Sequence, residues 1–201
     1  MKKIMIQSHI NYILLISIVL IATMVRYYQL NNGFGINMPI KTETYSVNQV
    51  VNVGNNVFCG EKGYDCINAK VINSSINNID YYDNVINLEN VSNKEEFKVL
   101  TVDLELNNTG SKTLNINYSF FRVLGCDWCT ITDEELTYAI NNTDSQSADG
   151  IIALKPNKTE IIKLAFVLSS DMFNKTRFQR LYEEDIRFSL TSFPISRQIV
   201  I

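Results

Sequence analysis

The sequence predicts an all-β protein, an antiparallel β-sandwich preceded by a single N-terminal transmembrane helix. Three features support this prediction: an uncharged apolar run near the N-terminus, several segments in which apolar and polar residues alternate, and polar turns between those segments. Alternation with a period of two is typical of half-buried strands, and several short strands with little helix are typical of a sandwich. The same periodicity also permits a partly open barrel.

The apolar run covers residues 10–25, contains no charged residue and is followed by Arg26 and two tyrosines. A membrane-spanning helix needs about 17–25 apolar residues, and tyrosines commonly lie at the membrane interfaces. A cleaved signal peptide is the alternative, but its apolar core is usually about 7–15 residues long and ends in small residues, which fit poorly here. We therefore expect a short cytoplasmic segment at 1–9 and an uncleaved signal-anchor helix at 10–28.

The orientation follows from the positive charges around this run. Lys2 and Lys3 precede it, whereas Arg26 and the more distant Lys41 follow it. Retained positive charge favours the cytoplasmic side, so we expect a single-pass protein of the cell membrane with the N-terminus inside and the C-terminal domain outside.

Composition excludes several function classes for the outer part. All 21 acidic residues follow the apolar run, so the region beyond it is net acidic and an unsuitable partner for nucleic acid or anionic headgroups. The single histidine, His9, precedes the run, which removes histidine-dependent catalysis from the outer domain. The chain of 201 residues leaves room for one such domain. We expect a tether at 29–42, which holds two Gly and one Pro, and one extracytoplasmic β-sandwich domain at 43–201.

Residues 100–107 give the clearest strand signal. Leu100, Val102, Leu104 and Leu106 are apolar, and the residues between them are polar. The turn Asn107–Gly110 follows, and residues 114–120 then alternate again. Two alternating runs around a glycine-containing turn predict a β-hairpin.

Later segments complete the expected sandwich. Residues 162–168 alternate with an outer face that is also largely apolar, which predicts a central strand covered on both sides. Further strands are expected at 186–190, and more weakly at Tyr45–Val53 and Cys66–Ile72. Short helices are expected at Ser169–Leu181 and Glu134–Ile140.

The stretch from Phe97 to Leu168 contains FKVLTVDLELNN, NTGSK, TLNINYSFFRV and ALKPNKTEIIKLAFVL. It resembles the immunoglobulin-like (telokin-like) β-sandwich domains of unknown function in anchored or secreted proteins of Gram-positive bacteria. Leu154, Pro156 and Phe166 occupy the places of a Leu-x-Pro element and of the Phe that ends the following strand, whereas Asn157 stands where that family often has Gly. The resemblance implies an immunoglobulin-like sandwich. That family has no agreed active site, so it supplies no catalytic residue.

Four cysteines, Cys59, Cys66, Cys126 and Cys129, lie in the part expected outside the cell. An oxidising compartment and an even number favour two structural disulfides, most simply Cys59–Cys66 and Cys126–Cys129. A zinc-thiolate site is a second interpretation, although only the Cys-x-x-Cys pair has the usual ligand spacing. A thiol-redox role for Cys126 and Cys129 is a third, although no βαβ pattern surrounds them. We expect no metal or other cofactor.

The acidic clusters 133–135 and 183–185 lack the alternating spacing of a calcium loop and are interpreted as solvated faces. No nucleophile elbow or phosphate-binding glycine loop is present, and no catalytic residue is assigned. Trp128, between two cysteines, is the candidate for an exposed aromatic contact, with a core residue packed on a disulfide as the equal alternative.

The sequence therefore predicts a non-enzymatic binding or interaction module at the cell surface, attached to the membrane by its N-terminal helix. The alternative function is an extracytoplasmic thiol-redox or zinc-thiolate protein acting through Cys126 and Cys129. A structural accessory subunit of a membrane complex is a third possibility.

Overall fold

The structure, a computed structural model, describes residues 17, 20–21, 23–24, 41–86, 93–141 and 150–201. The chain divides into two compact units, Met1–Met38 and Pro39–Ile201, each of which is considered by itself. Within the described residues, no helix has the length and apolarity that a membrane crossing requires. The helix expected at 10–28 lies largely outside the described residues. The same holds for the tether expected at 29–42, whose last two residues belong to the first strand.

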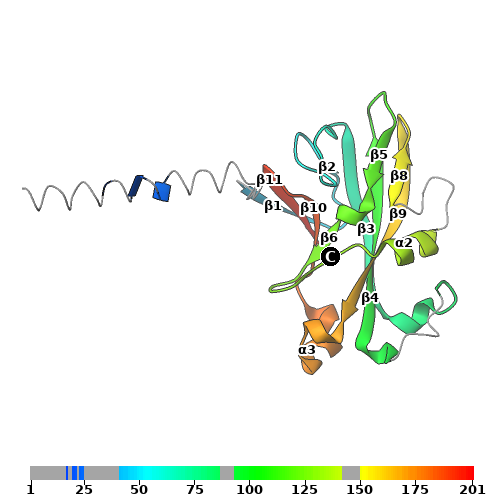
Figure 1. Ribbon diagram of the computed structural model, residues 1–201. Helices are drawn as coiled ribbons and strands as arrows, with labels where there is room; N and C mark the ends of the chain where they lie inside the picture. The colour runs from blue at the N-terminus through cyan, green and yellow to red at the C-terminus, as the bar shows by residue number, and fades with distance from the viewer. Residues whose placement is uncertain (1–16, 18–19, 22, 25–40, 87–92, 142–149) are drawn as a thin grey trace, which may run out of the picture. The chain divides into compact units, whose positions relative to one another are not determined.

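The second unit consists of two main β-sheets (Figure 1). The first sheet has five strands in the order β1-β11-β10-β6-β7, of which β1 pairs with β11 in parallel and the other pairs are antiparallel. Their bounds are β1 Lys41–Ser46, β6 Arg122–Leu124, β7 Cys129–Ile131, β10 Arg187–Thr191 and β11 Ile195–Val200.

The second sheet has four antiparallel strands in the order β2-β3-β4-β9, and β5 and β8 form a separate pair. Three of its strands are 12 residues long and pair over most of their length, with one irregularity in β3 between Val71 and Asn73. The bounds are β2 Val51–Asn52, β3 Ile67–Asn78, β4 Phe97–Asn108, β5 Leu114–Asn117, β8 Ile151–Leu154 and β9 Lys158–Ser169.

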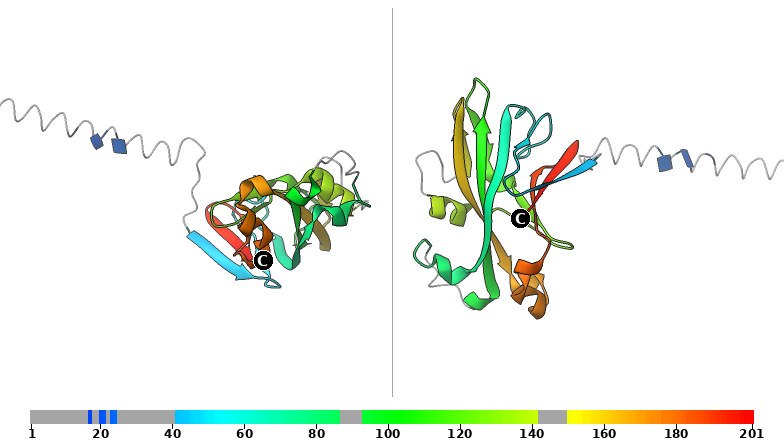
Figure 2. Two further views of the ribbon diagram at one scale, coloured as in Figure 1. Left: turned by 90° about the horizontal axis from the view of Figure 1, so that it is seen from below. Right: turned by 180° about the vertical axis from the view of Figure 1, so that it is seen from behind.

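The main core lies between the two sheets, which Figure 2 shows from two further directions. Leu104 of β4 and Phe166 of β9 face Phe188 of β10 and Ile199 of β11, and all four side chains are fully buried. The rings of Phe166 and Phe188 are 6.4 Å apart in an edge-on arrangement. Alternating residues of the long strands supply this core, so the predicted β-sandwich is confirmed.

Short helices cover part of the outer face of the four-stranded sheet. Helix α2, Glu134–Asn141, packs on β9, and the 3-10 turn η1, Ile79–Tyr82, packs beside it. Together they bury Val99 and Ala165 in a second, smaller apolar cluster. The helix expected at Glu134–Ile140 is therefore present, and Asp133 caps it by accepting a hydrogen bond from the Leu136 amide at 2.9 Å.

The helix expected at Ser169–Leu181 is broken into three short pieces. These are the 3-10 turn η4 Ser170–Met172, the helix α3 Lys175–Gln179 and the 3-10 turn η5 Leu181–Glu183. Separate caps explain the breaks, because Ser169 accepts a hydrogen bond at the start of η4 and Asn174 does so at the start of α3. The remaining 3-10 turns are η2 Lys94–Glu96 and η3 Tyr118–Phe120.

The predicted hairpin between residues 100–107 and 114–120 is wrong. Strand β4 pairs with β3 and β9, whereas β5 pairs with β8. The buried side chain of Asn108 explains the change of partner, because its Nδ2 donates to the carbonyls of Lys112 and Leu154 at 2.8 and 3.1 Å. The turn thus leads the chain away from β4 towards β8.

The prediction of a central strand at 162–168 is also wrong, because β9 is the last strand of its sheet. Its outer face is nevertheless covered at Ala165 and Val167, which pack with α2 and η1 in the second cluster, whereas Ile161 on the same face is exposed. Helix packing, rather than a further strand, accounts for the apolar outer residues at 165 and 167.

Candidate functional site

The segment Cys126-Asp127-Trp128-Cys129, which contains three of the candidate site residues, lies at the turn that joins β6 to β7. Leu124 and Cys129 are cross-strand partners, and the Gly125 amide donates to the Trp128 carbonyl at 3.0 Å. Residues 125–128 therefore form a tight turn, with Cys126 and Asp127 at its tip.

Trp128 is buried, with 8% of its surface exposed. Its ring meets Phe173 edge-on at 5.3 Å, and its Nε1 donates a hydrogen bond to Glu184 Oε2 at 3.1 Å. Of the two alternatives for Trp128, the structure has the core residue. The indole lies directly against Gly125, because a Cβ at that position would stand 2.0 Å from Trp128 Nε1.

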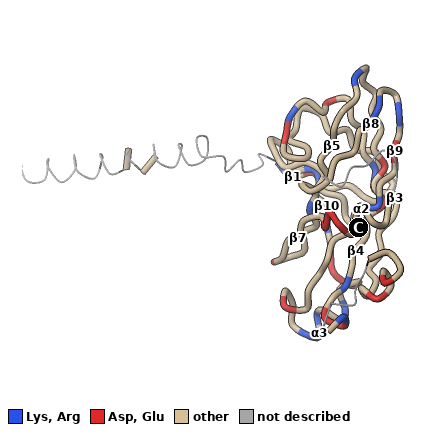
Figure 3. Tube along the Cα trace, turned by 45° about the vertical axis from the view of Figure 1, so that its right-hand side comes forward, with Lys and Arg blue, Asp and Glu red and all other residues tan. Residues whose placement is uncertain are grey.

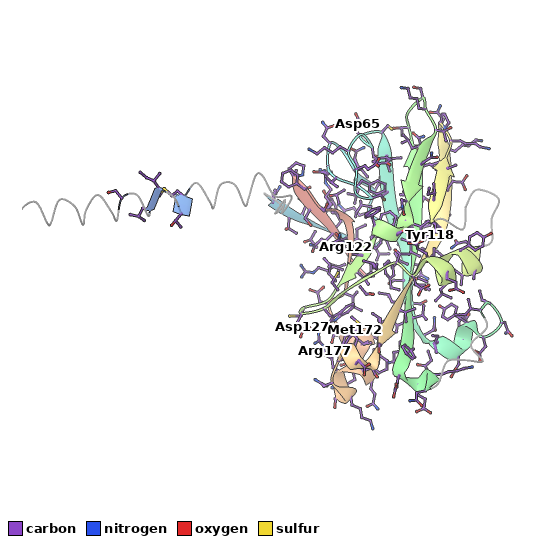
Figure 4. All side chains as sticks on the ribbon, viewed as in Figure 1. Asp65, Tyr118, Arg122, Asp127, Met172 and Arg177 are labelled. Carbon is purple, nitrogen blue, oxygen red and sulfur yellow. The ribbon has the colours of Figure 1, made fainter. Side chains whose placement is uncertain are left out.

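Arg177 of α3 fastens the turn to the segment that precedes β10. Its guanidinium pairs with Asp127 at 2.7 Å, and it makes two hydrogen bonds with Glu184, one of them at 2.9 Å. It also lies over the Phe173 ring, 5.6 Å from the ring centre. Figure 4 shows Asp127 and Arg177 close together at this end of the molecule.

These contacts set the electrostatics of the turn. The hydrogen bonds from Arg177 lower the pKa of Glu184, the Trp128 indole contributes in the same direction, and burial opposes both. The hydrogen bonds with Glu184 and then Asp127 raise the pKa of Arg177. The arginine is therefore held as a cation between two carboxylates, in a planar forked geometry that fixes its orientation.

A groove with a volume of about 650 Å³ opens beside this turn. Arg177 and Glu184 line one part of it, and Arg187 of β10, which pairs with Asp185 at 2.6 Å, lines another. Figure 3 shows acidic and basic residues interspersed around α3. The full set of lining residues is Leu124, Gly125, Cys126, Arg177, Glu184, Asp185, Arg187 and Gln198. The groove thus offers a polar ligand oriented donors and acceptors together with an apolar side chain.

All four cysteines for which disulfides are predicted are free thiols in the structure. Cys126 and Cys129 are exposed, Cys66 is half-buried, and Cys59 is buried, so that burial and then the charge of Glu61 raise the pKa of Cys59. No group of three or more His, Cys, Asp or Glu side chains that could hold a metal occurs in the described ranges. The two predicted disulfides are not formed in this structure, and the pairing stays a prediction.

Sequence reasoning missed the residues that hold the turn. Glu184 was interpreted as part of a solvated acidic face, yet its side chain is only 16% exposed because it binds both Trp128 and Arg177. Trp128 lies 56 residues before Glu184, and no local pattern joins them. The only sequence signal is that Arg177 lies six residues before the acidic cluster 183–185.

The chain was compared with known proteins. The family model of the domain of unknown function DUF5028 matches residues 42–197. No curated protein matches the chain significantly.

Three solved structures are similar to it in fold. An uncharacterized β-sandwich protein from Clostridium difficile is 8% identical over 80% of this chain and 95% of its own, with a TM-score of 0.44. A functionally unknown protein from Listeria monocytogenes is 12% identical over 72% of this chain and 76% of its own, with a TM-score of 0.41.

A Bacillus subtilis protein described as a lipoprotein is 17% identical over 68% of this chain, with a TM-score of 0.42. The chain spans only 36% of the length of that protein. The DUF5028 model, in contrast, covers both main sheets of the sandwich nearly from end to end, and the chain therefore belongs to the DUF5028 family of domains of unknown function.

Proposed function

We propose that this chain is a membrane-anchored extracytoplasmic module that binds a protein or another cell-surface partner through the groove beside the β6–β7 turn. The observation that carries the proposal is the groove itself, about 650 Å³ in volume and lined by two arginine–carboxylate pairs, Arg177–Glu184 and Arg187–Asp185. Arg177 and Arg187 are each held by carboxylates, so their donors are presented without further ordering when a partner arrives.

The amino-acid types in the groove suit recognition of a polar surface. Arginine is enriched where interfaces carry much of their binding energy, and Gln198 adds an amide with both a donor and an acceptor. Opposite charges lie side by side in the groove, so a partner would need matching charges of both signs.

The finer classification as an immunoglobulin-like domain is part of this proposal. One sheet of an immunoglobulin variable-type domain has the strand order G-F-C-C′. The strand order β11-β10-β6-β7 corresponds to it, with β11 in the place of strand G and β7 in the place of strand C′. The parallel pairing of the first strand with the last strand supports the same classification.

The proposed location is supported by the uncharged run at 10–25 and by the family region, which begins at residue 42, the last residue of the expected tether. Protease added to intact producing cells should digest residues 43–201. A C-terminal domain that survives intact, while the same amount of protease degrades it in lysed cells, would contradict the proposed orientation.

The binding role is tested by replacing Gln198 with the photo-cross-linking residue p-benzoylphenylalanine in the full chain, in living producing cells. Illumination should give a discrete adduct from position 198. Arg187→Gln should weaken that adduct, and the same probe at the exposed Val50, which does not line the groove, should give none. Equal adducts from both positions would contradict a specific site.

A second candidate function is thiol chemistry at Cys126 and Cys129. It is favoured by one observation, the exposure of both thiols, Cys126 at the tip of the turn and Cys129 at the start of β7. Reaction of both with a disulfide reagent at low concentration, with release of the thiol leaving group, would support it. Slow reaction, at the rate of an unstructured peptide of the same sequence, would leave the binding role as the better account.

A further inference from the structure

A second, smaller pocket lies near the start of β6, apart from the groove. It has a volume of about 80 Å³ and includes Arg122 of β6 and Ser189 of β10, which are direct cross-strand partners. Partners of this kind have their side chains on the same face, with Cβ atoms about 4.5–5.5 Å apart. Figure 4 labels Arg122 on this strand.

Three donor side chains of this pocket have no acceptor among the described residues: Arg122 and Ser192, which are exposed, and Ser189, which is half-buried. Arg122 forms no ion pair or hydrogen bond with any residue of the described ranges, and every other arginine of those ranges pairs with a carboxylate. The hydroxyls of Ser189 and Ser192 likewise make no hydrogen bond to described residues. The hydroxyl of Thr191, in contrast, donates to the Ile195 carbonyl and accepts from the Arg197 amide.

The backbone explains why these groups gather here. The register of β10 against β11 shifts between Ser189 and Thr191, and such irregularities re-aim side chains and commonly occur beside functional sites. Ser192 follows directly, where its amide binds the carbonyl of Val57 in the loop after β2.

The surroundings add one more cation and a partly apolar wall. Lys62 lies over the ring of Phe193, next to Ser192, with Nζ 5.7 Å from the ring centre. Phe120, half exposed, stands against Gly60 at the opposite wall of the pocket. A negative charge also lies nearby, since the carboxylate of Glu61 acts on Cys59, a lining residue of the pocket, and on Tyr64.

We propose that this pocket binds the oxyanion group of a ligand, a phosphate or a carboxylate, with the Arg122 guanidinium and the hydroxyls of Ser189 and Ser192 as donors. A volume of about 80 Å³ accepts a group of a few heavy atoms, since one water takes about 30 Å³ in the liquid. Arginine binds both groups through parallel hydrogen bonds, and hydroxyl donors complete their coordination. The site differs from the groove in all its lining residues, so it stands or falls independently of the proposed function.

Isothermal titration of the full chain in nonionic detergent micelles tests this, with sodium phosphate and sodium acetate as separate probes in a chloride buffer. Saturable binding of phosphate alone points to a phosphate-bearing ligand, and binding of acetate points to a carboxylate-bearing one. Arg122→Gln should weaken the bound probe about tenfold or more, and Ser189→Ala with Ser192→Ala by a smaller factor.

Arg180→Gln is the matched control, because it removes the same charge from an exposed arginine that lies outside the pocket and pairs with Glu183. It should leave the affinity unchanged, while Glu61→Gln should strengthen it by removing the nearby negative charge. Three results would each overturn the proposal: no saturable binding of either probe, unchanged binding by Arg122→Gln, or equal weakening by Arg180→Gln. The thermal unfolding midpoint of each variant shows that it is folded.

Discussion

The side-chain amide of Asn141 pairs with the backbone of Lys163 as a neighbouring strand would. The Lys163 amide donates to Asn141 Oδ1 at 2.9 Å, and Asn141 Nδ2 donates to the Lys163 carbonyl at 2.8 Å. Two residues on, the Ala165 amide donates to Thr137 Oγ1 at 2.9 Å. Helix α2 thus satisfies the free edge of β9 at Lys163 and Ala165 with side chains and blocks the pairing of another strand there.

Replacing Asn141 by Ala should destabilise the protein by about 1–3 kcal/mol, because it leaves two backbone groups of the strand edge without partners. It should also promote concentration-dependent self-association, since the edge is opened. Urea unfolding and light scattering measure the two effects. Asn84→Ala, the same change at an exposed amide whose side chain makes no hydrogen bond within the described ranges, should be nearly neutral. Equal effects of the two variants would contradict the role of α2.

Replacing Trp128 by Ala should cost about 3–5 kcal/mol of unfolding free energy, because the buried indole packs on Phe173 and binds Glu184. Trp128→Phe keeps an aromatic ring and should cost less. Denaturant unfolding of the two variants checks the order. An unchanged midpoint for Trp128→Ala would restore the exposed-contact interpretation.

Gly125→Ala should move the indole, because no methyl group fits 2.0 Å from its nitrogen. Trp128 is the only tryptophan of the chain, so its fluorescence reports this directly, and we expect emission at longer wavelength as the ring gains solvent. Gly63→Ala is the control, since nothing lies within 4 Å of its added Cβ. It should leave the emission of the folded protein unchanged, although the positive φ of 102° at Gly63 makes the substitution destabilising through backbone strain.

The attachment of β1 should weaken in acid. Hydrogen bonds from Lys41, then Tyr45 and Arg197, lower the pKa of Glu43 from 4.5 to about 2. Arg197, on β11, also donates to the carbonyls of Asn52 and Val53 at 2.7 and 2.8 Å, so its pairing with Glu43 connects β1 to the end of β2 in the opposite sheet.

A carboxyl with a lowered pKa in the folded state contributes stability above its ordinary pKa and loses it as the pH falls towards the folded value. Glu43→Gln should therefore be less stable than the wild type at pH 7, and the difference should shrink between about pH 5 and pH 2. Urea midpoints across that range measure it. Glu95→Gln, an exposed position without an ion pair among the described residues, should show no such trend, and a constant gap for Glu43→Gln would refute the argument.

The cysteines should differ in reactivity. If they are free, as in the structure, Cys126 and Cys129 should be alkylated quickly in the folded protein. Cys59 should react only on unfolding, because it is buried and its pKa is raised. Intact mass after alkylation, with and without prior reduction, follows each site. A chain that takes up no label before reduction carries the disulfides that the sequence predicts.

Periodicity predicted the faces of the strands but not their neighbours. Alternating residues from Leu100 to Leu106 and from Ile162 to Leu168 do fill the core, and the short helix after Asp133 forms as expected. The hairpin prediction failed because a glycine-containing turn favours a change of direction without fixing which strand the chain meets next. Here the buried Asn108 binds Leu154 and thereby selects β8 as the partner of β5.

The sequence by itself determined the class of this protein, because alternation between water and core depends on each segment alone. It also marked the turn at Cys126 as a place to examine. Only the tertiary structure decided that Trp128 is buried and that Arg177 and Glu184 hold it. Only the tertiary structure placed Arg122 beside Ser189, as a cation without a partner in the described part of the chain. These contacts join residues 50 or more positions apart, and their energies depend on distance in space, which no local pattern records.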